Sequence, residues 1–200
     1  MVNLESEELK NGILKCFNNS KSLLSDADYL FEGNRFARAY SIYRLSIEEN
    51  QKSHKLINLI IEKSLNKDFS KEEKTEYNKF FTDHLMKIRA SAIENYTFFD
   101  FFEKYNLKQV KTKEQISNEI LNPKQIDLFK QYGFYTHLIN KKFKQPSDFI
   151  SKNKCQKIQS EAQLSLSKSR TFIDMFLTFP EVFIRKFLNV DFSIYDDIIE

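Results

Sequence analysis

The chain has 200 residues, which is enough for one domain with its own hydrophobic core. It contains only 3 Gly and 3 Pro, too few turn residues for a protein built from many strands. Charged residues make up 30% and aromatic residues 14%, which excludes a disordered chain, and no apolar run is long enough to cross a membrane. We therefore expect a single-domain, all-α protein that is not a membrane protein.

The formal net charge is only +3, but the charge is unevenly distributed along the chain. Residues 104–170 contain fourteen Lys or Arg and five acidic residues, whereas residues 171–200 contain two basic and six acidic residues. The basic section is suited to bind phosphate or an acidic protein, although a solvated lysine-rich surface is the simpler explanation. Lys141, Lys142 and Lys144 are its candidate contacts with a partner or RNA.

Two long helices are expected at the start of the chain. Apolar or small residues recur every three or four positions over residues 9–31, which predicts one amphipathic helix. Gly33 and Asn34 supply a left-handed stop, so a second helix should begin near Arg35, run to about Ser64 and pack back against the first. Its predicted buried stripe comprises Ala39, Ile42, Leu45, Ser46, Glu49, Ser53, Leu56 and Ile60.

Shorter helices should follow, without any sheet. Ser70 and Glu73 form a capping box that predicts a third helix reaching Phe99. Pro123 should open a short helix that ends at Gly133, and helical spacing continues over residues 149–179. Pro146 should open a further unit, and Pro180 either breaks the last helix or begins a final short one to Leu188. The expected organisation is a core at residues 5–105, additional helices at 114–190 and a fraying acidic tail at 191–200.

Polar residues interrupt two of the predicted apolar stripes. Glu49 lies in the stripe of the second helix, and His84 lies in that of the third. Lys52 follows Glu49 by three residues and lies on the same helical face. Lys87 follows His84 at the same spacing. A carboxylate facing a core needs a partner, so we expect Glu49 and His84 to touch. Either this cluster fixes helix register or it is a functional site, and in the first case Glu49→Ala should be strongly destabilising.

No cofactor or metal is expected. His54, His84 and His137 lie on different segments without ligand spacing, and the chain lacks a glycine-rich phosphate loop. Cys16 and Cys155 are too far apart to suggest a metal site and are expected to be free thiols. Because the first residues are acidic where a signal peptide would be basic and apolar, we expect a cytoplasmic protein.

The same residues carry a resemblance to a known family. Residues 22–55 resemble the opening of the AbiV family of bacterial abortive-infection proteins, which are classed with the HEPN superfamily. The match includes an Ile-Glu-Glu-x-x-Lys element formed by Ile47, Glu48, Glu49 and Lys52. A second element is Phe-x-x-His-x-x-Lys, formed by Phe81, His84 and Lys87. A looser match covers residues 130–146, and together these elements span most of residues 20–150.

The resemblance implies an HEPN-like antiparallel helical bundle and a role in phage defence, in which the infected cell stops growing before new phage are released. Similar proteins often form homodimers. Many HEPN proteins are ribonucleases built around an Arg followed by four to six residues and a His. This chain has no such motif, because nine residues separate Arg44 from His54 and no closer Arg precedes His84 or His137 at that spacing.

Two functional hypotheses follow from these observations. The first is a non-enzymatic interaction protein, a homodimer that a phage-encoded protein triggers and that then blocks an essential process such as translation. The alternative is a degenerate HEPN-type ribonuclease acting on cellular or phage RNA. It would use His84 as acid or base and Lys52 or Lys87 to stabilise phosphate charge.

Overall fold

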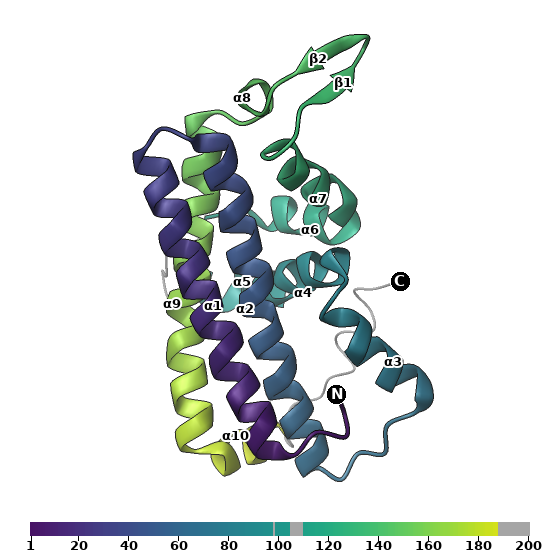
Figure 1. The fold of residues 1–200 in the computed structure, drawn as a ribbon. Coiled ribbons are helices and arrows are strands. Elements are labelled where there is room, and N and C mark those ends of the chain that lie inside the picture. Colours follow the sequence, from purple (N-terminus) through teal and green to yellow (C-terminus); the bar gives the residue numbers. More distant parts are fainter. Residues whose placement is uncertain (98, 105–109, 188–200) are drawn as a thin grey trace.

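Three long helices lie side by side in the computed structural model, which describes residues 1–97, 99–104 and 110–187. They are α1 (Ser6–Glu32), α2 (Phe36–Ser64) and α9 (Lys152–Thr178). Figure 1 shows that α1 and α2 form an antiparallel hairpin and that α9 runs alongside both. The predicted pair of helices and the predicted 149–179 helix are therefore confirmed.

The turn between α1 and α2 depends on Asn34. The left-handed residue is Asn34, with a φ of 59°, whereas Gly33 has an ordinary φ of −75°. The backbone N–H of Arg35 donates to the carbonyl of Leu30 at 2.8 Å and closes the turn. Asn tolerates the left-handed region better than most residues, so the predicted stop is confirmed but shifted by one position.

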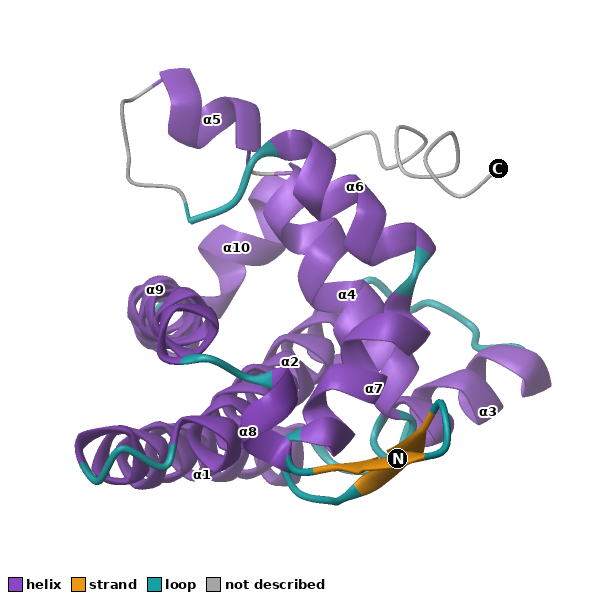
Figure 2. Ribbon diagram, turned by 90° about the horizontal axis from the view of Figure 1, so that it is seen from above, coloured by secondary structure: helices purple, strands orange, loops and turns teal. Residues whose placement is uncertain are grey.

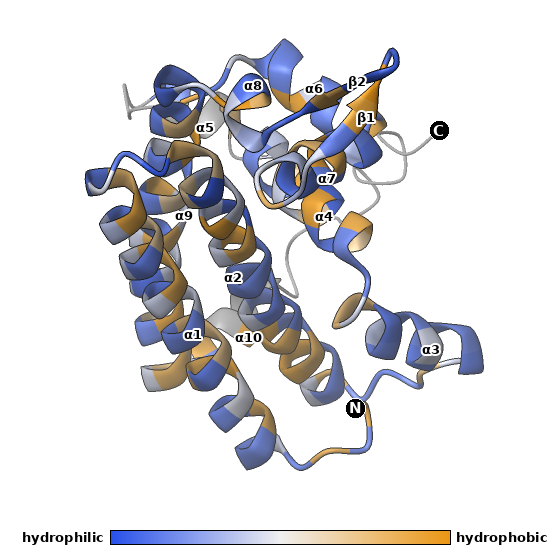
Figure 3. Cartoon of the chain, turned by 45° about the horizontal axis from the view of Figure 1, so that its top comes forward, coloured by the Kyte–Doolittle hydropathy of each residue, from blue (hydrophilic) through white to orange (hydrophobic). Residues whose placement is uncertain are grey.

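The helices α1, α2 and α9 enclose two apolar clusters. Figure 3 shows alternating blue and orange bands along α1 and α2, the pattern of helices with apolar faces. The cluster toward the start of α1 includes Leu9, Ile13, Ile57, Ile173 and Phe176. The cluster toward the α1–α2 turn includes Ala27, Ala39, Tyr43, Ile158 and Ala162.

Shorter helices lie on the other side of α2 (Figure 2), where α4 (His84–Thr97) and α7 (Pro123–Tyr132) pack against it. The others are α3 (Lys71–Phe80), α5 (Phe99–Lys104) and α6 (Lys113–Leu121). The Ser70–Glu73 capping box and the Pro123 start are confirmed. The prediction of a single third helix was wrong. Asp83 Oδ1 accepts hydrogen bonds from the N–H groups of Leu85 and Met86, so a new helix begins at His84. A second capping box, formed by Thr112 and Gln115, begins α6.

A small β-hairpin interrupts the helices. Strand β1 (His137–Ile139) pairs antiparallel with β2 (Lys142–Lys144), placing Leu138 opposite Phe143. The prediction that no sheet forms was wrong, because Asn140 and Lys141 adopt φ values of 50° and 62° and make a two-residue turn without glycine. In Figure 1 the hairpin projects beyond the end of the long helices.

Two short helices complete the described chain, α8 (Pro146–Phe149) and α10 (Pro180–Phe187). Pro146 and Pro180 therefore each open a helix, as proline suits a first helical turn. The fold is all-α apart from the hairpin, and the predicted acidic tail at 191–200 lies outside the described residues. Across residues 1–97, 99–104 and 110–187, no helix has the length and apolar character needed to span a bilayer.

Candidate functional site

The polar residues of α2 occupy a face that the sequence pattern did not select. Helix α2 lies between α1, α9 and the group α4–α7, so it is buried on nearly every side. Ile42, Leu45 and Glu49 of the predicted stripe are only half-buried, whereas Arg44 and Glu48 are buried. A helix with a single buried face was the wrong assumption for this central helix.

Glu48 is the centre of a buried ionic cluster between α2, α4 and α7, which we call the Glu48 cluster: Glu48, His84, Asp127 and Lys130. Glu48 Oε2 lies 2.5 Å from Nδ1 of His84, and Glu48 Oε1 accepts from the Lys130 ammonium at 2.7 Å. The same ammonium lies 2.8 Å from Asp127 Oδ1. One cation thus joins two carboxylates, and the His84 ring approaches from the surface.

Close helix packing places Lys130 at this position. Gly133, just after α7, lies so close to α2 that a Cβ there would be 2.4 Å from the carbonyl oxygen of Ala37. The hydroxyl of Ser41 donates to the carbonyl of Lys130 at 2.6 Å and ties the end of α7 to α2. The close packing of the end of α7 on α2, which requires glycine at position 133, therefore brings the Lys130 ammonium to Glu48.

Glu49 does not touch His84, contrary to the sequence prediction. It pairs instead with Lys52 at 2.6 Å, one helical turn along α2. Glu49 faces α1. Burial of the Cys16 thiol raises its pKa to about 11, and the negative charge of Glu49 adds to this effect. Adjacent residues on a helix point about 100° apart, so Glu48 faces α4 while Glu49 faces α1.

Lys87 completes the predicted set but is not available to a ligand. It is buried, and its ammonium donates to the carbonyl of Phe81 at 3.4 Å. Burial lowers the pKa of Lys87, and the nearby charges of Lys52 and Lys130 lower it further, against the opposing effect of Glu48 and Glu49. Of the four predicted residues, His84 is the one with an exposed functional group.

The Glu48 cluster holds a half-exposed imidazole in one orientation. The His84 side chain is 51% exposed, whereas that of Glu48 is 4% exposed. Glu48 is matched by Lys130, and in one tautomer of His84 its carboxylate accepts the Nδ1–H of the ring. Nε2 of His84 is then left with a lone pair that can accept a proton, which is the arrangement of a carboxylate-oriented general base.

A second buried cluster, the His54 network, joins α2, α4 and α9 and resembles a hydrolytic triad. His54 Nε2 lies 2.7 Å from the Ser169 hydroxyl, and His54 Nδ1 lies 3.1 Å from Glu94. However, the Ser169 hydroxyl donates to the carbonyl of Ser165 at 2.9 Å and accepts from Asn50 at 2.6 Å. Its only hydrogen is used, so the His54 network joins helices rather than activating a nucleophile.

His54 is therefore protonated on both ring nitrogens. Burial alone lowers the pKa of His54, but the charge of Glu94 outweighs it and the pKa is raised. For Glu94, burial alone raises the pKa. The charge of His54 outweighs burial, so the pKa of Glu94 is lowered. This ion pair stabilises the contact between α2 and α4.

The raised pKa of His54 predicts a pH-dependent stability. A raised pKa contributes stability fully below the unfolded value of about 6.5, and this contribution is lost as the pH rises through the folded pKa. The free energy of unfolding of the parent should thus decline above about pH 6.5 more steeply than that of His54→Gln. Urea unfolding at several pH values, with an NMR titration of the His54 ring, checks this. A His54 pKa at or below about 6.5 would contradict it.

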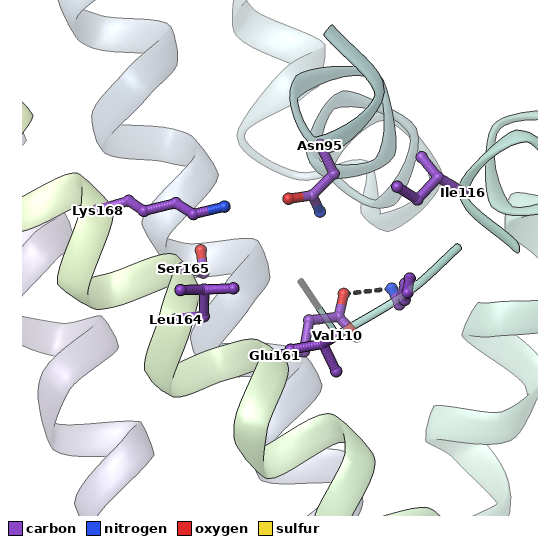
Figure 4. A pocket seen from close by; sticks show the side chains of 8 residues that line it. Asn95, Val110, Ile116, Glu161, Leu164, Ser165 and Lys168 are labelled. Carbon is purple, nitrogen blue, oxygen red and sulfur yellow. Dashed lines mark hydrogen bonds and ion pairs between the residues drawn. The ribbon is translucent and has the colours of Figure 1, made fainter. Parts of the chain in front are cut away.

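A third cluster, the Arg44 network, closes the bundle beside a small cavity. Lys111 pairs with Glu119 at 2.6 Å and with Glu161, and Arg44 lies 3.5 Å from Glu119 and 3.6 Å from Glu161. Figure 4 shows Asn95, Ser165 and Lys168 around the adjacent cavity of about 30 Å³. This volume holds about one water molecule, so the cavity is not a site for an organic ligand.

The hairpin carries the predicted contact lysines together with exposed apolar groups. Leu138 and Phe143 are 62% and 78% exposed and lie directly opposite each other across the two strands. Lys141 is in the turn, and Lys142 and Lys144 lie in β2. The hairpin therefore presents an apolar pair surrounded by positive charge, which the lysine content alone did not reveal.

The described ranges 1–97, 99–104 and 110–187 contain no group of three or more His, Cys, Asp or Glu placed to bind an ion. Cys16 and Cys155 are both free. Burial raises the pKa of Cys155 to about 12, so its thiol is inert at neutral pH.

Comparison with known proteins identifies the family. The amino-acid sequence matches a family model of HEPN proteins, described as AbiV, over residues 8–166. The chain therefore belongs to the AbiV family. No curated protein and no solved structure matches it. The match confirms the resemblance seen in the sequence and extends it through most of α9, and family membership suggests an anti-phage, abortive-infection role.

Proposed function

We propose that the protein acts in phage defence as a non-enzymatic interaction protein, triggered by a phage-encoded protein and then blocking an essential process such as translation. The observation that supports this most directly is the exposed Leu138–Phe143 pair on a projecting hairpin. Large apolar side chains paired on a surface, with a basic rim, are typical of protein contact sites. Lys141, Lys142 and Lys144 would favour an acidic partner.

The hairpin can be tested without disturbing the core. Leu138→Ser combined with Phe143→Ser should leave the melting temperature near that of the parent, because both side chains are exposed. Loss of two central contacts typically costs about 2 kcal/mol or more, which lowers affinity about 30-fold, so protection in a plaque assay should fall sharply. Tyr29→Ser is the matched control, since Tyr29 is an exposed aromatic residue on α1. Undiminished protection by the double variant would contradict the proposal.

We also propose that the protein is a homodimer, on the basis of its family and of the number of aromatic side chains in the chain. Light scattering of the purified protein at micromolar concentration measures the mass directly. A mass near 23.9 kDa, that of one chain, would contradict this part of the proposal.

A second candidate function is RNA cleavage, favoured by the hydrogen bond between Glu48 and the half-exposed His84. Nε2 of His84 would take the proton of a ribose 2′-hydroxyl. Lys52 and Lys87 give this candidate less support, because Lys52 is paired with Glu49 and Lys87 is buried.

Purified protein incubated with total RNA, with and without phage lysate, separates the two functions. If the protein is a ribonuclease, His84→Ala should abolish cleavage while keeping a near-parental melting temperature, and Arg89→Ala, an exposed change further along α4, should cleave normally. Absence of cleavage in every sample, or protection by folded His84→Ala and Lys87→Met variants equal to that of the parent, would remove this candidate.

A further inference from the structure

The edges of the β-hairpin offer backbone groups to a further strand. The two residues between β1 and β2 have positive φ values, and a two-residue turn of this kind is closed by a hydrogen-bonded pair, here Ile139 and Lys142. Pairs alternate along antiparallel strands, so the N–H and C=O groups of Leu138 and Phe143 point outward, away from the other strand. Within the part of the chain that the structure describes, no other group bonds to these backbone atoms. Each edge of the hairpin can therefore take a third strand.

The two faces of the hairpin differ in chemistry. Side chains alternate between the two faces of a strand, so Leu138 and Phe143 share one face. Lys142 and Lys144 of β2 lie on the opposite face. The free edge of β2 therefore suits a strand with alternating side chains, apolar on the face of Phe143 and acidic on the face of the two lysines.

A segment of the chain itself has this pattern. Val190, Phe192 and Ile194 alternate with polar residues that include Asp191, which is the period of a strand with one apolar face. Residues 189–200, which we call the acidic segment, contain four acidic residues and no Lys or Arg. The acidic segment lies outside the described residues, and its sequence complements β2 in both alternation and charge.

The alternating part of the acidic segment cannot reach β2 of its own chain. Ile184 of α10 packs on the apolar cluster toward the start of α1, whereas β2 joins the start of α9 through α8. Figure 1 shows α10 and the hairpin at opposite ends of the long helices. Helix α9 has 27 residues and so spans about 40 Å. Val190 comes three positions after Phe187, the end of α10, a reach of at most about 11 Å. The β2 strand within reach is therefore that of a second copy.

We propose that residues 190–194 of one copy add as a third strand to β2 of a second copy. The apolar side chains of the added strand lie beside Phe143, and Asp191 lies beside Lys142 and Lys144. The exchange is mutual in a symmetric dimer, because each copy has both the acidic segment and the hairpin. This inference rests on the homodimer proposed above and names a contact that holds it together. The acidic segment also occupies the surface that the proposed function assigns to the phage-encoded partner.

Cross-linking of the full chain tests which segments meet. Isotope-labelled and unlabelled protein are mixed at micromolar concentration, allowed to exchange subunits and treated with a carbodiimide, which joins an amine directly to a neighbouring carboxylate. Mass spectrometry should find Lys142 or Lys144 linked to Asp191, with labelled peptides joined to unlabelled ones. Links within single chains only, or no link from the hairpin to the acidic segment, would overturn the proposal.

Exchange of one charge pair tests the strength of the contact, with the Kd of the dimer measured by light scattering on serial dilution. Lys142→Glu and Asp191→Lys should each raise this Kd about tenfold, because either change replaces an attraction by a repulsion at both contacts of the dimer. The two changes combined should restore the parental Kd. Lys15→Glu, the same change at an exposed site on α1, should leave the Kd unchanged. A Kd that neither single change in the pair affects would overturn the proposal.

Failure of this contact is distinguishable from failure of the proposed function. A protein that remains one chain in light scattering contradicts the homodimer itself, and the exchange with it. A dimer without these cross-links overturns the exchange alone. The plaque assay of the hairpin variants does not depend on the acidic segment, so the contact between the hairpin and a phage-encoded partner is tested separately.

Discussion

Replacing Glu48 with alanine should lower the free energy of unfolding by about 3 kcal/mol, one of the two largest effects that we expect from a single substitution. Removing one partner of a buried ion pair typically costs about 3–5 kcal/mol, because the other charge is left uncompensated. The lower end of this range applies, since Asp127 still lies 2.8 Å from the Lys130 ammonium. Urea unfolding followed by circular dichroism measures the change.

The neighbouring glutamate provides a matched control. Glu49→Ala removes the same group, but from a partly exposed pair with Lys52, so its cost should be about 1 kcal/mol or less. Glu48→Leu combined with Lys130→Met should recover part of the lost stability, because a well-packed apolar pair can replace a buried ion pair but Asp127 loses its partner Lys130. Equal losses for the two single glutamate variants would show that burial does not make Glu48 more important to stability than Glu49.

Gly133→Ala should be as destabilising as Glu48→Ala, at about 3 kcal/mol. The new methyl group would lie 1.9 Å from the Ser41 hydroxyl and 2.4 Å from the carbonyl oxygen of Ala37, and a backbone atom cannot move aside cheaply. Overpacking typically costs about 1–3 kcal/mol, and loss of the bond from Ser41 to the Lys130 carbonyl adds about 1 kcal/mol. The same denaturation experiment measures the change.

Gly33→Ala serves as the control for this second prediction. Gly33 also follows a helix, but a Cβ added there would lie 3.5 Å from the nearest atom. The φ of Gly33 is one that any residue can adopt. We expect no loss of stability there, and a gain of up to about 1 kcal/mol from the less flexible unfolded chain. A Gly133→Ala variant as stable as Gly33→Ala would mean that α7 can shift along α2 without penalty.

Helix starts were predicted well where the signal lies within three or four residues of the start. The Ser70–Glu73 capping box and the proline at Pro123 each mark a helix start that the structure has. The break at His84 was missed because the apolar spacing continues across it, while the signal that ends the pattern is a single acid, Asp83. The hairpin was missed because its turn uses Asn140 and Lys141 rather than glycine.

The predicted polar cluster shares one residue, His84, with the Glu48 cluster and none of its contacts. A period of about 3.6 residues identifies one buried face, so the pattern predicts Glu49 as the buried carboxylate where the structure has Glu48. Helix α2 has several, since three groups of helices pack on it. Lys130 comes from a helix 82 residues later, and no local pattern relates it to Glu48. Contacts of this range depend on the tertiary arrangement alone.

The position of α9 in the chain also bears on how the protein forms during its synthesis. Residues 152–178 leave the ribosome after almost every other described element, yet they supply one wall of both apolar clusters through residues such as Ile158 and Ile173. The Glu48 cluster, in contrast, uses only residues that have emerged by Lys130. A nascent chain therefore holds all members of that cluster before it can close its core, and a product terminated early would expose α2 to chaperones and proteases.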